Sequence, residues 1–582
     1  MILQALTQCY EDLLAQGKAD RPGWSQARVS YGLVLNADGE LTQLLHLQQE
    51  EPRGKKTVLV PQSLLVPSPV KRSSGPRANF LCDNSSYLLG VDAKGKPTRT
   101  AECFAAAQTL HRELLQDADT PAARAVLRFF ETWAPTQAAD LPVLQEDWED
   151  LLKGGNLVFW YNNAPVTQDP VIANAWTQHY ESSDQDAEPV RCLVTGRQGP
   201  LARLHPAIKG VAGAQSVGAS LVSFNAQSFC SYDHEQGANA PVSEYAAFAY
   251  TTALNALLAD RDHVKRVGDT TILCWASGGE TAYQDCFLAG LFNDSYTEKD
   301  ILNVFHTLAK GEPVDWQEHR LDPATRFYVL GLAPNAARLS VRFFWQNTFG
   351  TLARNVAKHY KELEIIRPSY DKFATLPIWR LVQETVRKPA PGARPPEPNP
   401  RLAGDLLLCV LNGTRYPATL LDGVVLRIRA EHNVSRGQAA ITKAYYLRNS
   451  QNAQIKEVMT MQLNEQSTYL PYVLGRLFAV LEGLQQSANP GINTTIKDRY
   501  FNSASATPAT VFPLLINLAQ KHLGKLDGGL AKYYNEKITE LNGRITQTLP
   551  ARMSLPEQSA FQIGYYHETQ ARYTAKNKKE EQ

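Results

Sequence analysis

The segment KPAPGARPPEPNPRLAG at 388–404 restricts the possible folds of this chain more than any other feature. Six of the twelve residues from 389 to 400 are proline. Proline has no backbone N–H and a fixed φ, so such a run prefers an extended conformation and cannot enter a helix or the centre of a sheet. The sequence therefore predicts a linker at 388–404 between a region 1–387 and a region 405–582.

The two regions differ in their hydrophobic patterns. Before the linker, short apolar runs and turn signals predict mixed α and β structure. We expect β-hairpins in 28–100, with turns at 36–39 and 92–96, helices at 101–133, 242–259 and about 297–310, and strands at 156–161, 270–275, 326–332 and 338–346. After the linker nearly every apolar pattern has the helical period, including a leucine-rich stripe from Leu470 to Leu484. The predicted fold class is α+β, a mixed α/β N-terminal region followed by a C-terminal helical bundle.

Composition excludes several classes of protein. The eight cysteines form no C-x-x-C pair, which argues against a disulfide framework or a zinc ribbon and favours a reducing cytoplasm. Glu11 and Asp12 interrupt the N-terminal apolar pattern, so we expect an amphipathic helix there and no signal peptide. No apolar run reaches the ~18 residues of a membrane span, and we expect a soluble, cytoplasmic protein.

The near-zero net charge of +1 conceals an uneven distribution. Residues 401–582 carry +7 and residues 1–400 carry −6. Within the acidic part, the windows 52–82, 189–232 and 323–361 contain no Asp or Glu at all. Cationic side chains beside small and amide residues are typical of nucleic-acid binding. The alternative is buried strand with a few arginines at its ends, and the aromatic run at 343–345 is more often core than a stacking platform.

These windows supply the candidate site residues. For contacts with base edges we select Lys71, Arg72, Ser73, Ser74, Gly75, Asn79, Asn84, Gln215, Ser216 and Asn225. For contacts with phosphates we select Arg53, Lys55, Lys56, Arg191, Arg197, Arg203, Lys209, Arg338, Arg342 and Arg354. In the helical region, Lys443, Arg448 and Arg476 are candidates for a single-strand path, and Arg427 and Arg429 for docking the bundle. A surface turn or a solvated helix face is the structural alternative.

Motifs that carry catalysis are not found. The chain has no G-x-x-x-x-G-K-[ST], H-E-x-x-H or G-x-S-x-G pattern, and Cys192, His205 and Cys230 lack the paired spacing of a metal site. We expect no enzyme activity, cofactor or metal. A nuclease with dispersed ligands and a purely architectural subunit remain alternatives.

Long strings in the chain resemble one known family. They include KRSSGPRANFLCDNSSYLLG at 71–90, CLVTGRQGPLARLHPAIKGVAGAQSVGASLVSFN at 192–225, NAPVSEYAAFAYTTALNALLAD at 239–260 and INTTIKDRYFNSASATPATVFPLL at 492–515. They resemble the large subunit of the type I-C CRISPR Cascade surveillance complex, the Cas-eight-c family. The resemblance extends over essentially the whole chain.

This resemblance implies a non-catalytic reader of DNA. The large subunit recognises the protospacer-adjacent motif in target double-stranded DNA, promotes unwinding and R-loop formation, and presents the displaced strand to a helicase-nuclease effector. The resemblance implies that the candidates for base-edge contacts read this DNA motif and that the candidates for phosphate contacts hold the DNA backbone or the RNA handle. Its implied partners are the CRISPR RNA, the Cascade backbone and RNA-processing subunits, and a small subunit. In this family the small subunit can arise from an internal start, so Met459 or Met461 could begin a second product of about 461–582. Ordinary core packing is the alternative role of both methionines.

Overall fold

The computed structural model describes residues 1–53, 56–70, 72, 75–93, 96–183, 189–292, 298–371, 373–389, 392–394 and 396–580. The described residues divide into two compact units. Unit 1 consists of 1–207 and 222–256, and unit 2 consists of 208–221 and 257–582. Helices and strands alternate before residue 388 and helices follow it, so the predicted α+β class is confirmed.

Unit 1 is built on a seven-stranded sheet of order β3-β4-β1-β6-β5, with β2 on β1 and β7 on β6. The central strand β1 pairs with β4 and β2 along one edge and with the parallel strand β6 along the other. The predicted hairpin turn at 36–39 joins β1 to β2. The strands are β1 (Trp24–Leu35), β2 (Leu41–His46), β3 (Gln48–Arg53), β4 (Lys56–Pro67), β5 (Cys82–Asp83), β6 (Asn156–Tyr161) and β7 (Ala164–Pro165).

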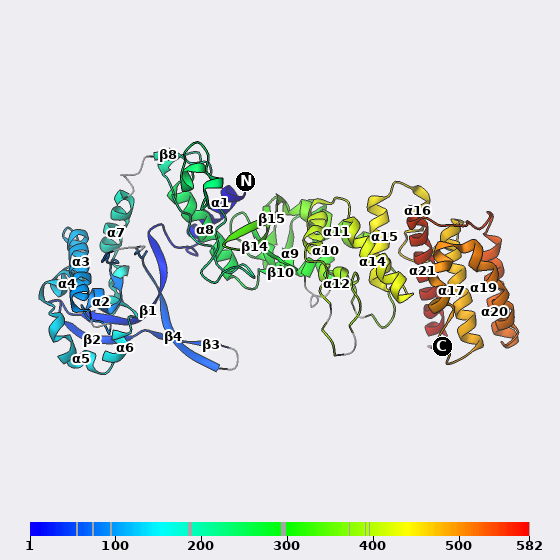
Figure 1. Ribbon diagram of the computed structural model, residues 1–582, viewed down its shortest axis with the longest axis horizontal. Coiled ribbons are helices and arrows are strands. Elements are labelled where there is room, and N and C mark those ends of the chain that lie inside the picture. The colour runs from blue at the N-terminus through cyan, green and yellow to red at the C-terminus, as the bar shows by residue number, and fades with distance from the viewer. Residues whose placement is uncertain are drawn as a thin grey trace. The chain divides into compact units, whose positions relative to one another are not determined.

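Helices of unit 1 cover this sheet and bury an aromatic core (Figure 1). Phe129, Phe130 and Phe159 pack edge to face, with ring centroids 5.2–5.6 Å apart. A second hairpin turn was predicted at 92–96, and residues 94 and 95 of it lie outside the described residues; the neighbouring elements are helices, one ending at Leu88 and one beginning at Pro97. The elements are α2 (Ser85–Leu88), α3 (Pro97–Leu115), α4 (Pro121–Thr132), η1 (Pro135–Asp140), α5 (Pro142–Gln145), α6 (Trp148–Leu152), η2 (Val166–Gln168) and α7 (Pro170–Ser183).

The remainder of unit 1 has little regular structure beyond two helices that pack together. Tyr10 of α1 (Ile2–Ala15) lies edge to face against Phe248 of α8 (Glu244–Ala259), with centroids 5.7 Å apart. Between α7 and α8 the chain forms the short ribbon β8 (Pro189–Arg191) and β9 (Gln198–Pro200), then η3 (Gln227–Phe229) and η4 (Gln236–Asn239). The predicted helices at the N-terminus and at 242–259 are confirmed.

Unit 2 begins with an antiparallel sheet of order β10-β11-β14-β15, from β10 (Lys265–Val267), β11 (Thr270–Ala276), β14 (Arg326–Asn335) and β15 (Arg338–Thr348). Phe343 and Trp345 are buried and Phe344 stacks on Tyr328, so the aromatic run at 343–345 is core. The short pair β12 (Val314–Trp316) and β13 (His319–Leu321) lies apart from this sheet. The helices here are α9 (Ala282–Phe292), α10 (Glu298–Ala309), α11 (Phe349–Leu363) and α12 (Ile378–Gln383).

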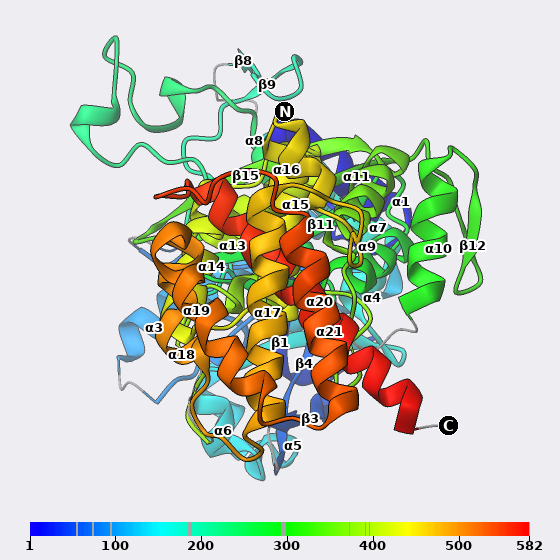
Figure 2. The ribbon, with the colours of Figure 1, turned by 90° about the vertical axis from the view of Figure 1, so that its right-hand side faces the viewer.

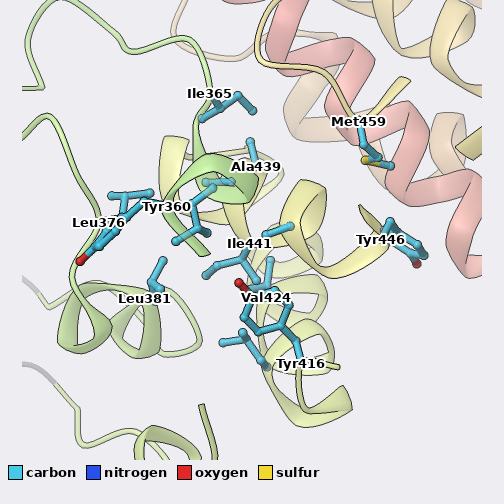
Figure 3. Packing of buried hydrophobic residues seen from close by; sticks show 14 of the residues in the cluster. Tyr360, Ile365, Leu376, Leu381, Tyr416, Val424, Ala439, Ile441, Tyr446 and Met459 are labelled. Carbon is cyan, nitrogen blue, oxygen red and sulfur yellow. The ribbon is translucent and has the colours of Figure 1, made fainter. Parts of the chain in front are cut away.

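The proline-rich segment does not divide two cores. One hydrophobic cluster runs from Val267 to Tyr566 and includes residues on both sides of the segment. Figure 3 shows Tyr360 and Leu381 before it beside Tyr416, Val424 and Ile441 after it. The carbonyl of Pro400 lies so close to Gly268 that a Cβ there would meet it at 2.1 Å. The described residues between 388 and 401 form no helix or strand, whereas a helix begins at Leu402, inside the predicted linker. The boundaries of the two units fall elsewhere.

Every described element after the segment is a helix, as predicted. The central helix α17 contacts α18, α19, α20 and α21 and is buried from Leu470 to Leu484. Its approach to α21 depends on Gly475 and Gly564, because a Cβ on either would lie 2.0–2.2 Å from a carbonyl oxygen of the other helix. The helices are α13 (Leu402–Asn412), α14 (Ala418–Glu431), α15 (Arg436–Asn449), α16 (Ala453–Val458), α17 (Leu470–Ala488), α18 (Ile496–Ala506), α19 (Pro508–Leu523), α20 (Gly528–Gly543) and α21 (Leu555–Glu580).

No described helix combines the length and the apolar character that a bilayer crossing would need.

Candidate nucleic-acid interface

Three arginines of the second acid-free window lie exposed on unit 1. Arg191 ends β8, Arg197 follows the turn from Cys192, and Arg203 follows β9. The turn is closed by the backbone N–H of Cys192, which donates to the Arg197 carbonyl at 2.9 Å. Among the described residues no carboxylate forms an ion pair with any of the three arginines. Exposed guanidinium groups without an internal partner are suited to phosphate binding.

A loop next to Arg203 presents an exposed aromatic side chain (Figure 2 shows this irregular chain beyond β8 and β9). The Tyr232 loop, residues 231–239, carries Tyr232 with 94% of its surface exposed. Tyr232 has φ +53° and Asp233 has φ +58°, a left-handed conformation that costs free energy for a side chain of this size. Because the ring makes little contact with the protein and the backbone is strained, other contacts must hold this turn in place.

Asn239 supplies that scaffold. Its amide nitrogen donates to the carbonyls of His234 and Gln236 at 3.0 and 3.1 Å, and its Oδ1 accepts from the N–H of Ser231 at 2.9 Å. Gly237 then anchors the loop, because its N–H donates to the carbonyl of Arg203 at 3.0 Å. The backbones approach so closely here that a Cβ on Gly237 would lie 2.0 Å from the carbonyl oxygen of Ala202. Tyr232 and Arg203 therefore belong to one rigid structure.

The sequence analysis did not select Tyr232. The available signal was an aromatic residue at the end of an acid-free, Gly/Ser-rich window that has no apolar periodicity. In such a segment a tyrosine has no element face on which to be buried, so exposure was the simplest expectation.

Cys192 is buried in the turn that Arg197 closes. Burial raises the pKa of its thiol, but hydrogen bonds with Ser243 and Thr195 outweigh that effect, and the pKa falls to about 7. His205 is bonded through Nδ1 to the Tyr250 hydroxyl at 2.7 Å. No cluster of three or more His, Cys, Asp or Glu arranged for a metal ion occurs in the described part of the chain.

The first window places several predicted motif readers in internal roles. Arg72 forms an ion pair with buried Asp83, donates to the Arg77 carbonyl at 2.7 Å and lies 4.0 Å from the centroid of the Tyr87 ring. Asn79 accepts from the N–H of Val70 at 3.0 Å. The sequence suggested that these polar side chains face DNA, whereas here they close their own loop.

The other candidate residues from this part of the sequence either have a place in the fold or lie outside the described residues. The Asn84 side chain caps α2 by accepting from the N–H of Ser86 at 3.0 Å. Gly75 is exposed with φ +72°. Arg53 and Lys56 pair across the β3–β4 hairpin through their backbones. Lys55, Lys71, Ser73 and Ser74 lie outside the described residues.

In unit 2, the loop 209–218 leaves the sheet and returns to it. The carbonyl of Ser220 accepts from the N–H of Leu339 on β15 at 3.0 Å, and Ile208 and Ala219 bond to each other. Lys209, Gln215 and Ser216 are exposed on this loop. Asn225 is also exposed, but it belongs to unit 1. The structure therefore distributes the predicted residues of the second window over both units.

The predicted residues of the third window differ in their surroundings. Arg342 of β15 is paired with Asp269 from the turn between β10 and β11, so a carboxylate far away in sequence neutralises it. Arg338 is half-buried on the same strand. Arg354 is exposed on α11.

The three cations predicted to line a single-strand path lie inside unit 2. Arg476 is completely buried, and its Nε donates to Glu568 at 2.8 Å. The Arg448 side chain is 4% exposed and its Nε donates to Glu362 at 2.7 Å. Lys443 donates to the Glu362 carbonyl at 2.7 Å, and burial lowers its pKa to about 8. This interior position corrects the prediction, because a strand on the surface cannot reach these groups.

The two arginines predicted to dock the helical bundle, Arg427 and Arg429, have different partners. Arg429 donates to Gln558 of α21 at 2.9 Å, which fits the predicted docking role. Arg427 pairs with Glu431 of its own helix at 3.0 Å.

Comparison with known families gives one match. The family model of the CRISPR-associated protein (Cas_Csd1) matches residues 6–573, nearly the whole chain. The chain therefore belongs to this family of CRISPR-associated proteins. No curated protein matches the chain.

Proposed function

We propose that this chain is the large subunit of a type I-C Cascade surveillance complex and that it reads the protospacer-adjacent motif without catalysing a reaction. The family match supports a role in CRISPR defence. In RNA-guided systems the protein reads a short motif and the duplex shape, while base pairing reads the target. The chain would bind CRISPR RNA, the backbone and RNA-processing subunits, a small subunit and, after R-loop formation, a helicase-nuclease.

The observation that carries the DNA role is the Tyr232 loop beside Arg203. Proteins that open duplex DNA commonly insert an apolar or aromatic wedge between base steps while cations hold the flanking phosphates. Here Tyr232 is fully presented to solvent, its loop is fixed by Asn239, and Arg191, Arg197 and Arg203 are exposed on the same unit. We assign Tyr232 the wedge role and the arginines the phosphate contacts.

Binding by the assembled complex tests this function. Complexes prepared with and without the chain are titrated with duplexes that carry or lack the adjacent motif. We expect tight binding only when both the chain and the motif are present, and equal affinity in all four combinations would overturn the proposal. Incubation of the chain with single- and double-stranded DNA and magnesium tests the alternative of a nuclease. Cleavage that is abolished by a single carboxylate substitution would support that alternative.

The wedge has its own test. A duplex with 2-aminopurine next to the motif reports unstacking through its fluorescence. Tyr232→Ala should lower duplex opening and weaken binding by about 1–3 kcal/mol, the usual value of one base–aromatic stack. Tyr533→Ala is the matched control, because Tyr533 is also exposed but lies on α20. Equal losses in both variants would remove Tyr232 from this role.

A further inference from the structure

A polar pocket in unit 2 has no part in the DNA-reading surface described above. Its volume is about 350 Å³, at the lower end of the range of about 300–1,000 Å³ common to ligand pockets. The walls come from the loop 368–370, the start of α15, the end of α17, the middle of α21 and the start of α18. Each of these segments contributes hydrogen-bonding side chains, so the pocket is suited to a polar ligand.

Positive charge exceeds negative charge on these walls. Lys388, Arg436, Lys497 and Arg572 line the pocket, and the one lining carboxylate is Glu482. Glu482 is already bonded, because it accepts from the hydroxyls of Tyr565 at 2.7 Å and Thr495 at 2.9 Å. Lys497 lies 3.9 Å from it. Even with that pair neutralised, the walls retain cations that can hold an anion.

Two buried polar atoms on the walls have no partner among the described residues. The Arg436 side chain is 8% exposed, and its terminal nitrogens bond to Asp371 at 3.1 Å and to the carbonyls of Phe373 and Ala374. Its Nε remains without an acceptor, and the hydroxyl of Thr569 is also unpaired. Buried donors are nearly always satisfied in folded proteins. Both residues line the pocket, and a ligand oxygen that reached either covered atom would supply its missing partner.

The Arg572 side chain passes over α17 at Gly483, where the helix has no side chain, and reaches the pocket. A Cβ on Gly483 would lie 1.7 Å from Nη1 of Arg572, so the guanidinium occupies the space that any side chain would fill. Its Nη2 donates to Gln486 at 3.2 Å. Its Nη1 donates to the Ala479 carbonyl at 3.5 Å, and the guanidinium has further N–H groups left to donate.

Aromatic rings complete the lining. Tyr370 is 82% exposed and Tyr573 is 50% exposed, and both belong to the pocket walls. Exposed tyrosine rings are surfaces on which a nucleobase can stack. Cations, unfilled donors and open rings together match one chemical class, a base joined to a phosphate.

We propose that this pocket binds a nucleotide, with the phosphate held by Lys388, Arg436 and Arg572 and the base stacked on Tyr370 or Tyr573. Phosphate offers more acceptor oxygens than a carboxylate, which suits several converging donors. The ligand is either a free mononucleotide or the phosphorylated end of a single strand, since both present the same group. The assignment does not depend on the proposed reading of the adjacent motif.

Calorimetric titration of the full chain tests the site with defined probes. Adenosine 5′-monophosphate, inorganic phosphate, and a DNA hexanucleotide with and without a 5′-phosphate are compared. We expect the monophosphate to bind at least tenfold more tightly than inorganic phosphate, because the base stacks. A stronger response to the 5′-phosphorylated hexanucleotide identifies a strand end as the ligand, and a response to the mononucleotide alone identifies a free nucleotide. Absence of binding by all four probes at millimolar concentration overturns the proposal.

Variants separate this pocket from general surface charge. Arg572→Gln should weaken mononucleotide binding at least tenfold, and Thr569→Val, which keeps the side-chain volume, should weaken it severalfold. Lys532→Gln is the control, since Lys532 is an exposed cation of α20 outside the pocket. A thermal melt confirms that each variant is folded. Unchanged binding in folded Thr569→Val and Arg572→Gln, or an equal loss in Lys532→Gln, contradicts the assignment.

Discussion

In unit 1, Arg191, Arg197 and Arg203 are exposed and form no ion pair with described residues, whereas in unit 2 Arg448 and Arg476 are buried against Glu362 and Glu568. An exposed cation retains its hydration and remains available to a phosphate, while a buried cation must be matched by an internal carboxylate. Arginines of the acid-free window 189–232 and arginines of the helical region, where carboxylates are present, therefore have different physical uses. The exposure of an arginine side chain, more than the charge of the surrounding sequence, decides whether the arginine is available to a ligand or has a structural role.

The largest effect should follow from breaking a buried pair. Arg476→Ala leaves the Glu568 carboxylate buried without its partner, and we expect a loss of about 3–5 kcal/mol in the free energy of unfolding. Chemical denaturation measures this loss. Arg476→Met with Glu568→Gln removes both charges and should recover much of the stability. If Arg476→Ala costs less than about 1 kcal/mol, the distinction between the two units fails.

Arg72 provides an intermediate case within unit 1, because it is partly exposed but bonded to buried Asp83. We expect Arg72→Ala to cost about 1–3 kcal/mol by leaving that carboxylate with one partner fewer. Burial already raises the pKa of Asp83 above its unfolded value, so the folded state binds more protons and this group stabilises less as pH rises. Removing Arg72 raises the pKa further. The loss should therefore be larger at pH 7 than at pH 5, and denaturation at the two pH values tests this order.

The exposed arginines should affect binding and leave stability nearly unchanged. Replacing Arg191, Arg197 and Arg203 by Ala should change the free energy of unfolding by no more than about 0.5 kcal/mol per site. If each contacts one phosphate, the slope of log K against log salt should fall by about 2–3. Arg99, Arg124 and Arg128 replaced by Ala give an equal change in charge elsewhere on unit 1. An equal change of slope in this control would mean that net charge alone determines binding.

Much of the fold could be predicted from local patterns. The β1–β2 hairpin follows from Asn36-Ala37-Asp38-Gly39, and α17 follows from a leucine stripe. The proline segment predicted a linker over 388–404, but the sequence could not show that Leu402 and Leu406 join the core of the preceding helices. That packing depends on contacts between distant residues, which periodicity does not encode.

The candidate site was less predictable for the same reason. Arg342 lies in an acid-free window, yet its partner Asp269 comes from a neighbouring strand turn. Lys443, Arg448 and Arg476 carry the charge expected of a binding path, but helix packing places them inside. The sequence could indicate that Tyr232 is exposed, because its segment has no apolar periodicity, but not that its loop is held in one conformation by Asn239. Sequence locates cations well and their partners poorly.

The smallest effect on stability should come from Tyr232 itself. Its ring is exposed and its φ of +53° is unfavourable for any residue except glycine, so Tyr232→Gly removes strain without removing packing. Strain relief of about 1 kcal/mol opposes the greater chain entropy that glycine adds to the unfolded state. We expect a change within about 0.5 kcal/mol in chemical denaturation. A loss above about 1 kcal/mol would show that the ring supports the fold of unit 1, and its assignment as a wedge held outward for DNA would then be wrong.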